Sequence, residues 1–561
     1  MSEHLFFTFS VENVSIWVHI PVITDCWKGD TSPTYCLGMA NTLGNDELSK
    51  YWDAANKLRK NLDAAEYKHI VLGLVFLKYV SDSFTERREE LIKEFANPAS
   101  DSYKSDASRR ESALEERDYY KMVNVFWVPE TSRWQEIQNN AKQPDIANRI
   151  DDALYKIERE NPKLEGIVER SYANAKLPVE DLGAVVDLIG SLNFGHDRHA
   201  ASDVLGQVYE YFLGMFASAE GKLGGQFYTT PSIVKTLVEV LQPTSGRVYD
   251  PCCGSGGMFV QSEKFVEAHG GKLGAISIYG QESNPTTRRL CAMNLAIRGI
   301  DFDLGKSSGD TFTQDQHPDV RFDYILMNPP FGSNADYPRE QLLGDARWKK
   351  YGIPREKPAN YAWMSHAVYH LAPKGRAGIV MPRGTLTSNQ GGDDAIRKAF
   401  LDDDVIECIV DLPGQLFFNT QIPSCLWFFN KDKSKWKNDR TDQVLFIDAR
   451  KMGTPISRTQ IEFSDEEIGR IAQTFNDWAN GTYEDVQGYC ASVSRSDIAN
   501  NTDSLSPGRY IGTDDVESES DEDFATRMAS LTEQLSEQFA KSHELEAIIR
   551  KNLSGLGYDL E

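Results

Sequence analysis

An asparagine followed by two prolines and an aromatic residue, Asn328-Pro329-Pro330-Phe331, ends the apolar run 322–327. That run predicts a buried strand with Asn328 at its carboxyl end. The amide oxygen and a neighbouring backbone carbonyl could there accept both N–H bonds of an exocyclic amine, such as that of adenine, and free the nitrogen lone pair. The prolines fix the carbonyl directions, and Phe331 offers a face for an extruded base. The motif predicts chemistry on a planar nitrogen, with a rigid turn as the alternative.

Three acidic residues upstream also stand at or near the ends of predicted elements. Asp250 ends a strand and precedes a turn that contains Gly254, Ser255, Gly256 and Gly257. Glu282 ends a second strand, and Asp310 follows a helix over 286–299. The turn is not the dinucleotide fingerprint, whose third glycine would fall on Phe259. An acid before such a turn suits a cationic ligand such as S-adenosylmethionine. Each acid alone could be a solvated or capping residue, but in series with Asn328 they trace one crevice.

Strand and helix patterns alternate from residue 226 to about residue 448, which predicts an α/β fold with a mostly parallel sheet covered on both faces. Helices are predicted over 46–95, a loop or frayed helix over 97–117, and further helices to about residue 216. The longest apolar stretch, 70–77, is too short to cross a bilayer. Eight scattered cysteines indicate neither a metal site nor a disulfide framework.

The order of these motifs resembles that of the N6-adenine DNA methyltransferases, and from about Leu43 the chain resembles the modification subunit of type I restriction-modification systems. The most specific segment is Gln226-Phe227-Tyr228-Thr229, which in the family precedes the methyltransferase core and closes over the cofactor. Family members usually place proline directly after that threonine, whereas here Thr230 intervenes before Pro231. The resemblance implies a Rossmann-like methyltransferase sheet, preceded by an N-terminal α-helical domain and followed by a C-terminal helical tail.

The resemblance also implies a role for each motif. Asp250 and the turn with Gly254, Ser255, Gly256 and Gly257 would hold the methionine end of S-adenosylmethionine. The covering segment would be Gln226, Phe227, Tyr228, Thr229, Thr230 and Pro231. Glu282 would bind the cofactor's ribose and Asp310 its adenine. Asn328 and the Pro329 carbonyl would orient the target amine on a loop that Pro330 stiffens, with Phe331 stacked on the base. No metal is expected.

The net charge of -24 opposes binding of a DNA duplex over most of the surface. We therefore expect a specificity subunit to read double-stranded DNA. The resemblance implies two copies of this chain for each specificity subunit and a restriction subunit in the full complex. Basic residues over 339–355 and Arg383 could line the DNA path. Gly305-Lys306-Ser307 lacks the upstream spacing of a phosphate-binding loop, so ATP-driven steps belong to another subunit. A cytoplasmic location fits.

Four regions are expected along the chain: an atypical N-terminal extension over 1–42, a helical domain over 43–218, the methyltransferase domain over 219–480 and a C-terminal region over 481–561. Residues before Met39 match nothing in the family and are expected to lack a functional role. In the C-terminal region, apolar residues from Phe524 to Ile549 recur at helical spacing, which predicts a helix that binds a partner subunit or packs on its own domain.

Two other functions fit parts of the pattern. A protein glutamine methyltransferase also acts on an amide nitrogen through an Asn-Pro-Pro-aromatic motif, but those enzymes resemble this chain only in the core. A non-catalytic assembly subunit would not need the intact Asn328 and strand-end acids.

Overall fold

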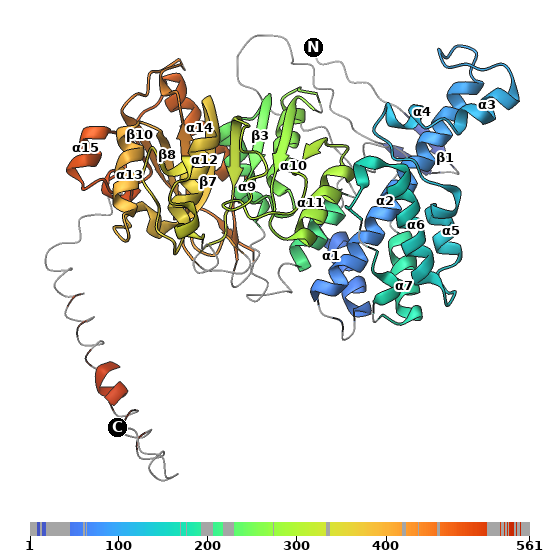
Figure 1. The fold of residues 1–561 in the computed structure, drawn as a ribbon, viewed down its shortest axis with the longest axis horizontal. Coiled ribbons are helices and arrows are strands. Elements are labelled where there is room, and N and C mark those ends of the chain that lie inside the picture. Colours follow the sequence, from blue (N-terminus) through green and yellow to red (C-terminus); the bar gives the residue numbers. More distant parts are fainter. Residues whose placement is uncertain are drawn as a thin grey trace. The chain divides into compact units, whose positions relative to one another are not determined.

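The computed structural model describes residues 8–11, 14–17, 45–59, 62, 64–168, 170–175, 177–191, 206–216, 229–272, 274–331, 337–417, 422–435, 437–456, 460–512, 528, 532, 536, 538–543, 546 and 550. The chain divides into two compact units, 1–42 and 43–561. In the first, β1 (Thr8–Val11) pairs antiparallel with β2 (Val14–Trp17). All further elements belong to the second unit (Figure 1).

The second unit begins with a helical segment, as the sequence predicts. Its helices are α1 (Asn45–Leu58), α2 (Ala64–Ala96), α3 (Ala107–Leu114), α4 (Asp118–Lys121), α5 (Trp134–Asn139), α6 (Ile146–Glu160) and α7 (Val179–Gly190), and residues 206–216 are also helical. Helix α3 lies in the stretch predicted as a loop or frayed helix. The Asp106 side chain caps its first turn by accepting hydrogen bonds from the backbone N–H groups of Ser108 and Arg109.

A nine-stranded sheet follows, in the order β13-β10-β8-β9-β7-β6-β3-β4-β5. The strands are β3 (Gly246–Asp250), β4 (Ile276–Gly280), β5 (Phe302–Asp303), β6 (Phe322–Met327), β7 (Leu371–Pro382), β8 (Ile406–Asp411), β9 (Ser424–Asn430), β10 (Gln443–Asp448) and β13 (Cys490–Ser494). Strands β5, β4, β3, β6 and β7 are mutually parallel, and β8 is parallel to β10. Strand β9 is antiparallel to β7 and β8, and β13 is antiparallel to β10. The prediction of a mostly parallel α/β sheet is confirmed.

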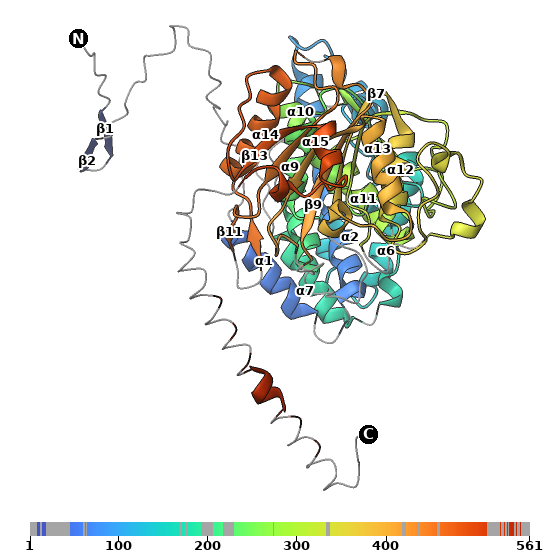
Figure 2. The ribbon, with the colours of Figure 1, turned by 90° about the vertical axis from the view of Figure 1, so that its left-hand side faces the viewer.

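Side chains alternate between the two faces of this sheet. In β9, Leu426 and Phe428 join one apolar core, whereas Cys425, Trp427 and Phe429 join the other. The period of two is what a strand buried on both faces requires. The first core includes residues of α9 (Pro231–Leu241), α10 (Gly257–Ala268), α11 (Pro285–Ile297) and α14 (Asp465–Asn480), and the second includes residues of α12 (Asn360–His370), α13 (Asp393–Asp402) and α15 (Arg495–Asn500) (Figure 2).

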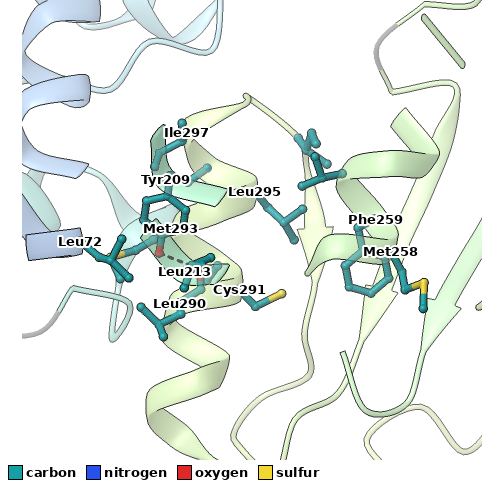
Figure 3. Close-up of a cluster of buried hydrophobic side chains, with 14 of the residues drawn as sticks. Leu72, Tyr209, Leu213, Met258, Phe259, Leu290, Cys291, Met293, Leu295 and Ile297 are labelled. Atoms are coloured by element: carbon teal, nitrogen blue, oxygen red, sulfur yellow. Dashed lines mark hydrogen bonds between the residues drawn. The ribbon is translucent and has the colours of Figure 1, made fainter. Parts of the chain in front are cut away.

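The helical segment and the sheet share the first of these cores. Leu72 of α2 lies in one buried cluster with Tyr209 and with Leu290, Met293 and Ile297 of α11 (Figure 3). The Tyr209 hydroxyl donates a hydrogen bond to the Leu290 carbonyl at 3.2 Å. Burial of one leucine or isoleucine contributes about 1.5–3 kcal/mol, so this junction stabilises the packing of α11 against the helical segment.

The boundary predicted after residue 480 falls inside the sheet, because β13 pairs with β10 over Cys490–Ser494. The nine-stranded sheet therefore continues past that boundary. The boundary at residue 218 stays a prediction. Most of the apolar stripe predicted in the C-terminal helix lies outside the described residues, apart from Met528, which is helical and exposed. Among the described residues, no helix is long and apolar enough to span a membrane.

Candidate active site at the carboxyl edge of the sheet

Strands β6, β3 and β4 are parallel neighbours, so their carboxyl ends meet at one edge of the sheet. Asp250, the last residue of β3, lies in register with Gly280, the last residue of β4. Glu282 stands two residues after Gly280, and Asn328 directly follows β6. The topology thus brings three of the predicted site residues to the same edge, as expected for a ligand crevice in an open α/β sheet.

Asn328 is held by one hydrogen bond and has one polar atom left over. Its side-chain nitrogen donates to the Thr229 hydroxyl at 2.8 Å. Its side-chain oxygen is buried and has no hydrogen-bond partner within the described part of the chain. Because a buried acceptor without a partner costs about 1–3 kcal/mol, an unpaired amide oxygen at a strand end indicates a place where a ligand's donor can bind.

Asp250 is a buried carboxylate, only 2 % exposed. It accepts a hydrogen bond from the Cys252 backbone N–H at 3.0 Å. Burial raises its pKa to about 7, and the nearby Glu282 carboxylate adds to the rise. No ion pair to Asp250 exists among the described residues. A buried acid without a cation favours a positively charged ligand, which would restore its ionised form.

The turn after Asp250 has a backbone that only glycine adopts easily. Gly254 and Gly256 have φ angles of +53° and +84°. A Cβ at residue 256 would also lie 2.9 Å from the Cys291 sulfur. Ser255 is fixed through its carbonyl, which accepts a hydrogen bond from the Asn294 side chain at 2.8 Å, and Gly257 begins α10. The turn thus presents the amino end of a helix at the sheet edge, next to Asp250.

Glu282 and Asp310 both accept hydrogen bonds within the loops that follow the strands. Glu282 accepts hydrogen bonds from the backbone N–H of Gly254 at 3.1 Å and of Asn284 at 2.8 Å. Asp310 is exposed, and one of its oxygens accepts from the backbone N–H groups of Phe312 and Thr313 and from the Thr313 hydroxyl. Asp310 therefore caps a turn, and its part in ligand binding stays a prediction.

The predicted covering segment is only partly described. Gln226, Phe227 and Tyr228 lie outside the described residues. Thr229 contacts Asn328 through its hydroxyl. Thr230 is buried, and its hydroxyl has no hydrogen-bond partner among the residues that the structure describes. Pro231 begins α9. The segment thus reaches the Asn328 motif at Thr229.

Phe331 does not present an open face in this structure. It is 4 % exposed, and its ring meets that of Phe417 edge-on with centroids 6.0 Å apart. Pro329 is buried and Pro330 half-buried. Stacking on a base, which stays a prediction, therefore requires that the Phe331 ring first be uncovered.

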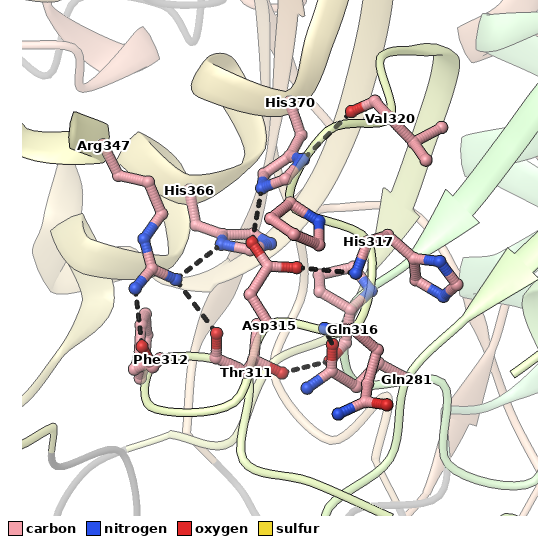
Figure 4. Close-up of polar contacts among 12 residues, drawn as sticks. Gln281, Thr311, Phe312, Asp315, Gln316, His317, Val320, Arg347, His366 and His370 are labelled. Atoms are coloured by element: carbon pink, nitrogen blue, oxygen red, sulfur yellow. Dashed lines mark hydrogen bonds and ion pairs between the residues drawn. The ribbon is translucent and has the colours of Figure 1, made fainter. Parts of the chain in front are cut away.

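Arg347 lies in the basic stretch predicted along the DNA path, but the structure places it in the interior. It is 5 % exposed, and its guanidinium donates to the carbonyls of Thr311 and Phe312 and to His366 (Figure 4). It also donates to the Asp345 carboxylate at 2.7 Å. Arg347 is therefore no surface cation for DNA. In the sequence, nothing distinguishes it from the other basic residues of that loop.

Asp315, His366 and His370 are close enough to share a metal ion. However, the ring nitrogens have protein partners: His370 contacts Asp315 at 3.0 Å and the Val320 carbonyl at 3.3 Å. His366 accepts from Arg347 at 3.1 Å, and burial together with His370 and Arg347 lowers its pKa well below the usual value. A guanidinium beside the ring opposes a cation there, so we assign this cluster to the polar network beneath the site.

Comparisons with known proteins agree with this geometry. Residues 200–519 match the model of the N-6 DNA methylases, and residues 49–189 match that of the HsdM N-terminal domain. The methylase subunit of the type I restriction enzyme HindI from Haemophilus influenzae is 45% identical over 77% of this chain and 100% of its own length. That of MjaIX from Methanocaldococcus jannaschii is 36% identical over 91% of each chain.

The fold is also that of a solved structure. The type I restriction-modification methyltransferase subunit from Streptococcus thermophilus superposes with a TM-score of 0.69 at 24% identity, over 83% of this chain and 99% of that one. On the family match and the two curated relatives, the chain belongs to the N-6 DNA methylases and, within them, to the methylase subunits of type I restriction enzymes.

Proposed function

We propose that this edge of the sheet transfers a methyl group from S-adenosylmethionine to the N6 nitrogen of an adenine flipped out of duplex DNA. The observation that carries the proposal is the Asn328 side-chain oxygen, buried and unpaired among the described residues. It lies at the same edge of the sheet as Asp250, a buried acid that has no ion pair among the described residues. The Asn328 oxygen fits a ligand with an N–H group, and the Asp250 carboxylate fits a methyl donor that carries a positive charge.

The residues present fit the cofactor. Asp250 would bind its cationic methionine end beside the glycine turn, where backbone groups can approach closely. Glu282 would bind the ribose and Asp310 the adenine, while residues 226–231 would cover the site. When bound, S-adenosylmethionine supplies an electrophilic methyl group on a sulfur that departs as a neutral thioether. The chain therefore needs no covalent nucleophile. It needs no strong base either, because the nitrogen would lose its proton only after the N–C bond has formed and made it cationic.

The Asn328 motif would bind and orient the target. The Asn328 oxygen would accept one N–H of the amine and the Pro329 carbonyl the other, which draws the nitrogen towards tetrahedral geometry. Thr229 already holds the Asn328 amide in the orientation that leaves its oxygen free. Phe331, once uncovered, would stack on the base. Alignment of the reacting atoms supplies most of the rate in such a reaction.

The partners follow from the family and from the charge. With a net charge of -24, the chain needs a more basic specificity subunit to reach double-stranded DNA. We propose two copies of this chain on each specificity subunit, a restriction subunit in the full complex and a cytoplasmic location. The protein glutamine methyltransferase is disfavoured, because residues 49–189 match the HsdM N-terminal domain.

The test is methyl transfer to DNA by the chain assembled with its specificity subunit. Asn328→Ala removes the acceptor, and loss of one such preorganised polar contact costs about 10²–10³-fold in rate. We expect that loss or more, with cofactor affinity nearly unchanged. Asn430→Ala, in β9, is the control, since it removes a buried amide of the same sheet that contacts Glu407. Methylation by Asn328→Ala at the control's rate would overturn the proposed role.

A further inference from the structure

Gln281 lies between the loops that carry the three candidate cofactor acids. It follows β4, is wholly buried and immediately precedes Glu282. Its backbone N–H donates to the Asp250 carbonyl at 3.0 Å, and its own carbonyl accepts from the Cys253 N–H at 3.0 Å. The backbone of Gln281 thus fixes the distance between the first and second loops.

The Gln281 side chain binds the third loop on both sides of Asp310. Its nitrogen donates to the carbonyls of Gly309 at 3.0 Å and Gln314 at 2.9 Å. Its oxygen accepts from the Gln316 N–H at 3.0 Å. Both donor hydrogens and the acceptor are therefore used in holding residues 309–316. Figure 4 shows Gln281 beside Gln316.

We propose that Gln281 is a positioning residue that sets the spacing of Asp250, Glu282 and Asp310, and so the fit of the whole cofactor rather than of any one part of it. This inference rests on the proposed function. A ligand that spans three loops gains affinity from simultaneous contacts only while the spacing of the loops matches its length. Gln281 itself needs no contact with the ligand.

Other contacts keep the third loop folded when Gln281 is changed. Arg347 holds the carbonyls of Thr311 and Phe312, and the Thr311 hydroxyl donates to the Pro251 carbonyl at 2.5 Å. Substitution at residue 281 would therefore remove the bonds to the Gly309 and Gln314 carbonyls and to the Gln316 N–H. The middle of the loop stays anchored, and the Gly309 N–H still donates to the Glu282 carbonyl at 3.1 Å. The expected result is a shift of Asp310 relative to Asp250, with the fold retained.

The experiment compares a whole ligand with its fragments. Calorimetry on the full chain measures the binding of S-adenosylhomocysteine, adenosine and methionine to the wild type and to Gln281→Met, which keeps the volume and loses the three side-chain hydrogen bonds. Because loss of these bonds lets Asp310 shift from the spacing that the whole ligand requires, we expect affinity for the whole ligand to fall about ten- to hundredfold. Affinity for each fragment should change by less than about threefold, because a fragment contacts fewer loops.

Asn430→Ala is the control for a purely structural loss. Its amide is equally buried, but it contacts Glu407 and the Asp432 backbone in the other half of the sheet. It should lower the melting temperature without changing affinity for the whole ligand or the fragments. Gln281→Glu, which keeps the length of the side chain, replaces Gln281→Met if the latter does not fold.

Two outcomes would overturn the inference: equal weakening of the whole ligand and its fragments, or no weakening of any of them. Absence of S-adenosylhomocysteine binding to the wild type would instead contradict the proposed function, so the two failures are distinguishable.

Discussion

The sheet contains two buried carboxylates in opposite situations. Glu407 of β8 is fully buried, and it accepts hydrogen bonds from Asn430, Arg440 and Arg376. Burial alone would raise its pKa, but the two guanidinium groups outweigh this effect and lower it. Asp250 of β3 is as deeply buried, but the described residues offer it no cation, and burial raises its pKa to about 7.

The presence or absence of a protein counter-charge distinguishes a structural carboxylate from a candidate ligand-binding one within the same sheet. Glu407 is complete without a ligand, because its charge is matched by protein groups that join β7, β8, β9 and the segment before β10. Asp250 and the Asn328 oxygen are incomplete, and both lie at the carboxyl edge of the neighbouring strands. Polar groups that the fold leaves unsatisfied at one edge are those that a ligand can satisfy.

The largest effect on stability is expected from Glu407→Gln. The substitution leaves the buried guanidiniums of Arg376 and Arg440 without their counter-charge, and breaking a buried pair in this way costs about 3–5 kcal/mol. Chemical denaturation would measure the loss. Cofactor affinity of the folded variant should stay within about twofold of wild type, since no contact with the candidate site is removed. A loss of stability below about 1 kcal/mol would show that Glu407 does not stabilise the fold through its contacts with Arg376 and Arg440.

A smaller effect is expected from pH on cofactor affinity. The pKa of Asp250 is raised to about 7 in the free protein, and a cationic ligand binds its ionised form. Affinity for S-adenosylmethionine should therefore rise as pH increases towards 7, by up to about tenfold for each unit below it. Titration calorimetry between pH 5.5 and about 7 measures this rise, and an affinity that is constant over that range would contradict it.

Whereas cofactor affinity should rise with pH, the contribution of Asp250 to the stability of the free protein should fall as pH rises. Because the folded pKa of Asp250 lies above its unfolded value of 3.8, its contribution to stability is fully present below pH 3.8 and is lost as pH rises through about 7. Glu407 has a lowered pKa, so its contribution is present above its unfolded pKa and lost only as pH falls through the lower folded value.

The sequence predicts which candidate site residues follow the strands, but it does not predict which buried side chains connect the loops after those strands. Asp250 and Asn328 are predictable because each follows an apolar run, and parallel strands must end at a common edge. The helices over 45–58 and 64–96 follow equally from apolar spacing. These features depend on local pattern, which one sequence displays.

Gln281 and Arg347 could not be found in that way. Gln281 contacts Gly309 and Gln314, about thirty residues away, and those partners are backbone carbonyls that carry no sequence signal. Arg347 carries the charge of a typical surface residue, and it is buried because its guanidinium finds partners in the carbonyls of Thr311 and Phe312, in Asp345 and in His366. The burial of Phe331 against Phe417 likewise depends on a contact between distant loops.

The central claim is that the Asp250 carboxylate binds the cationic end of the cofactor. Its most direct test is calorimetry of S-adenosylmethionine binding to Asp250→Asn. Asparagine keeps the shape and can still accept the Cys252 N–H, but it removes the charge. We expect affinity to fall by about hundredfold, the size of a lost charge-assisted contact of about 1.5–3 kcal/mol, while the free variant is at least as stable as the wild type near neutral pH. Affinity within about threefold of wild type would contradict the account.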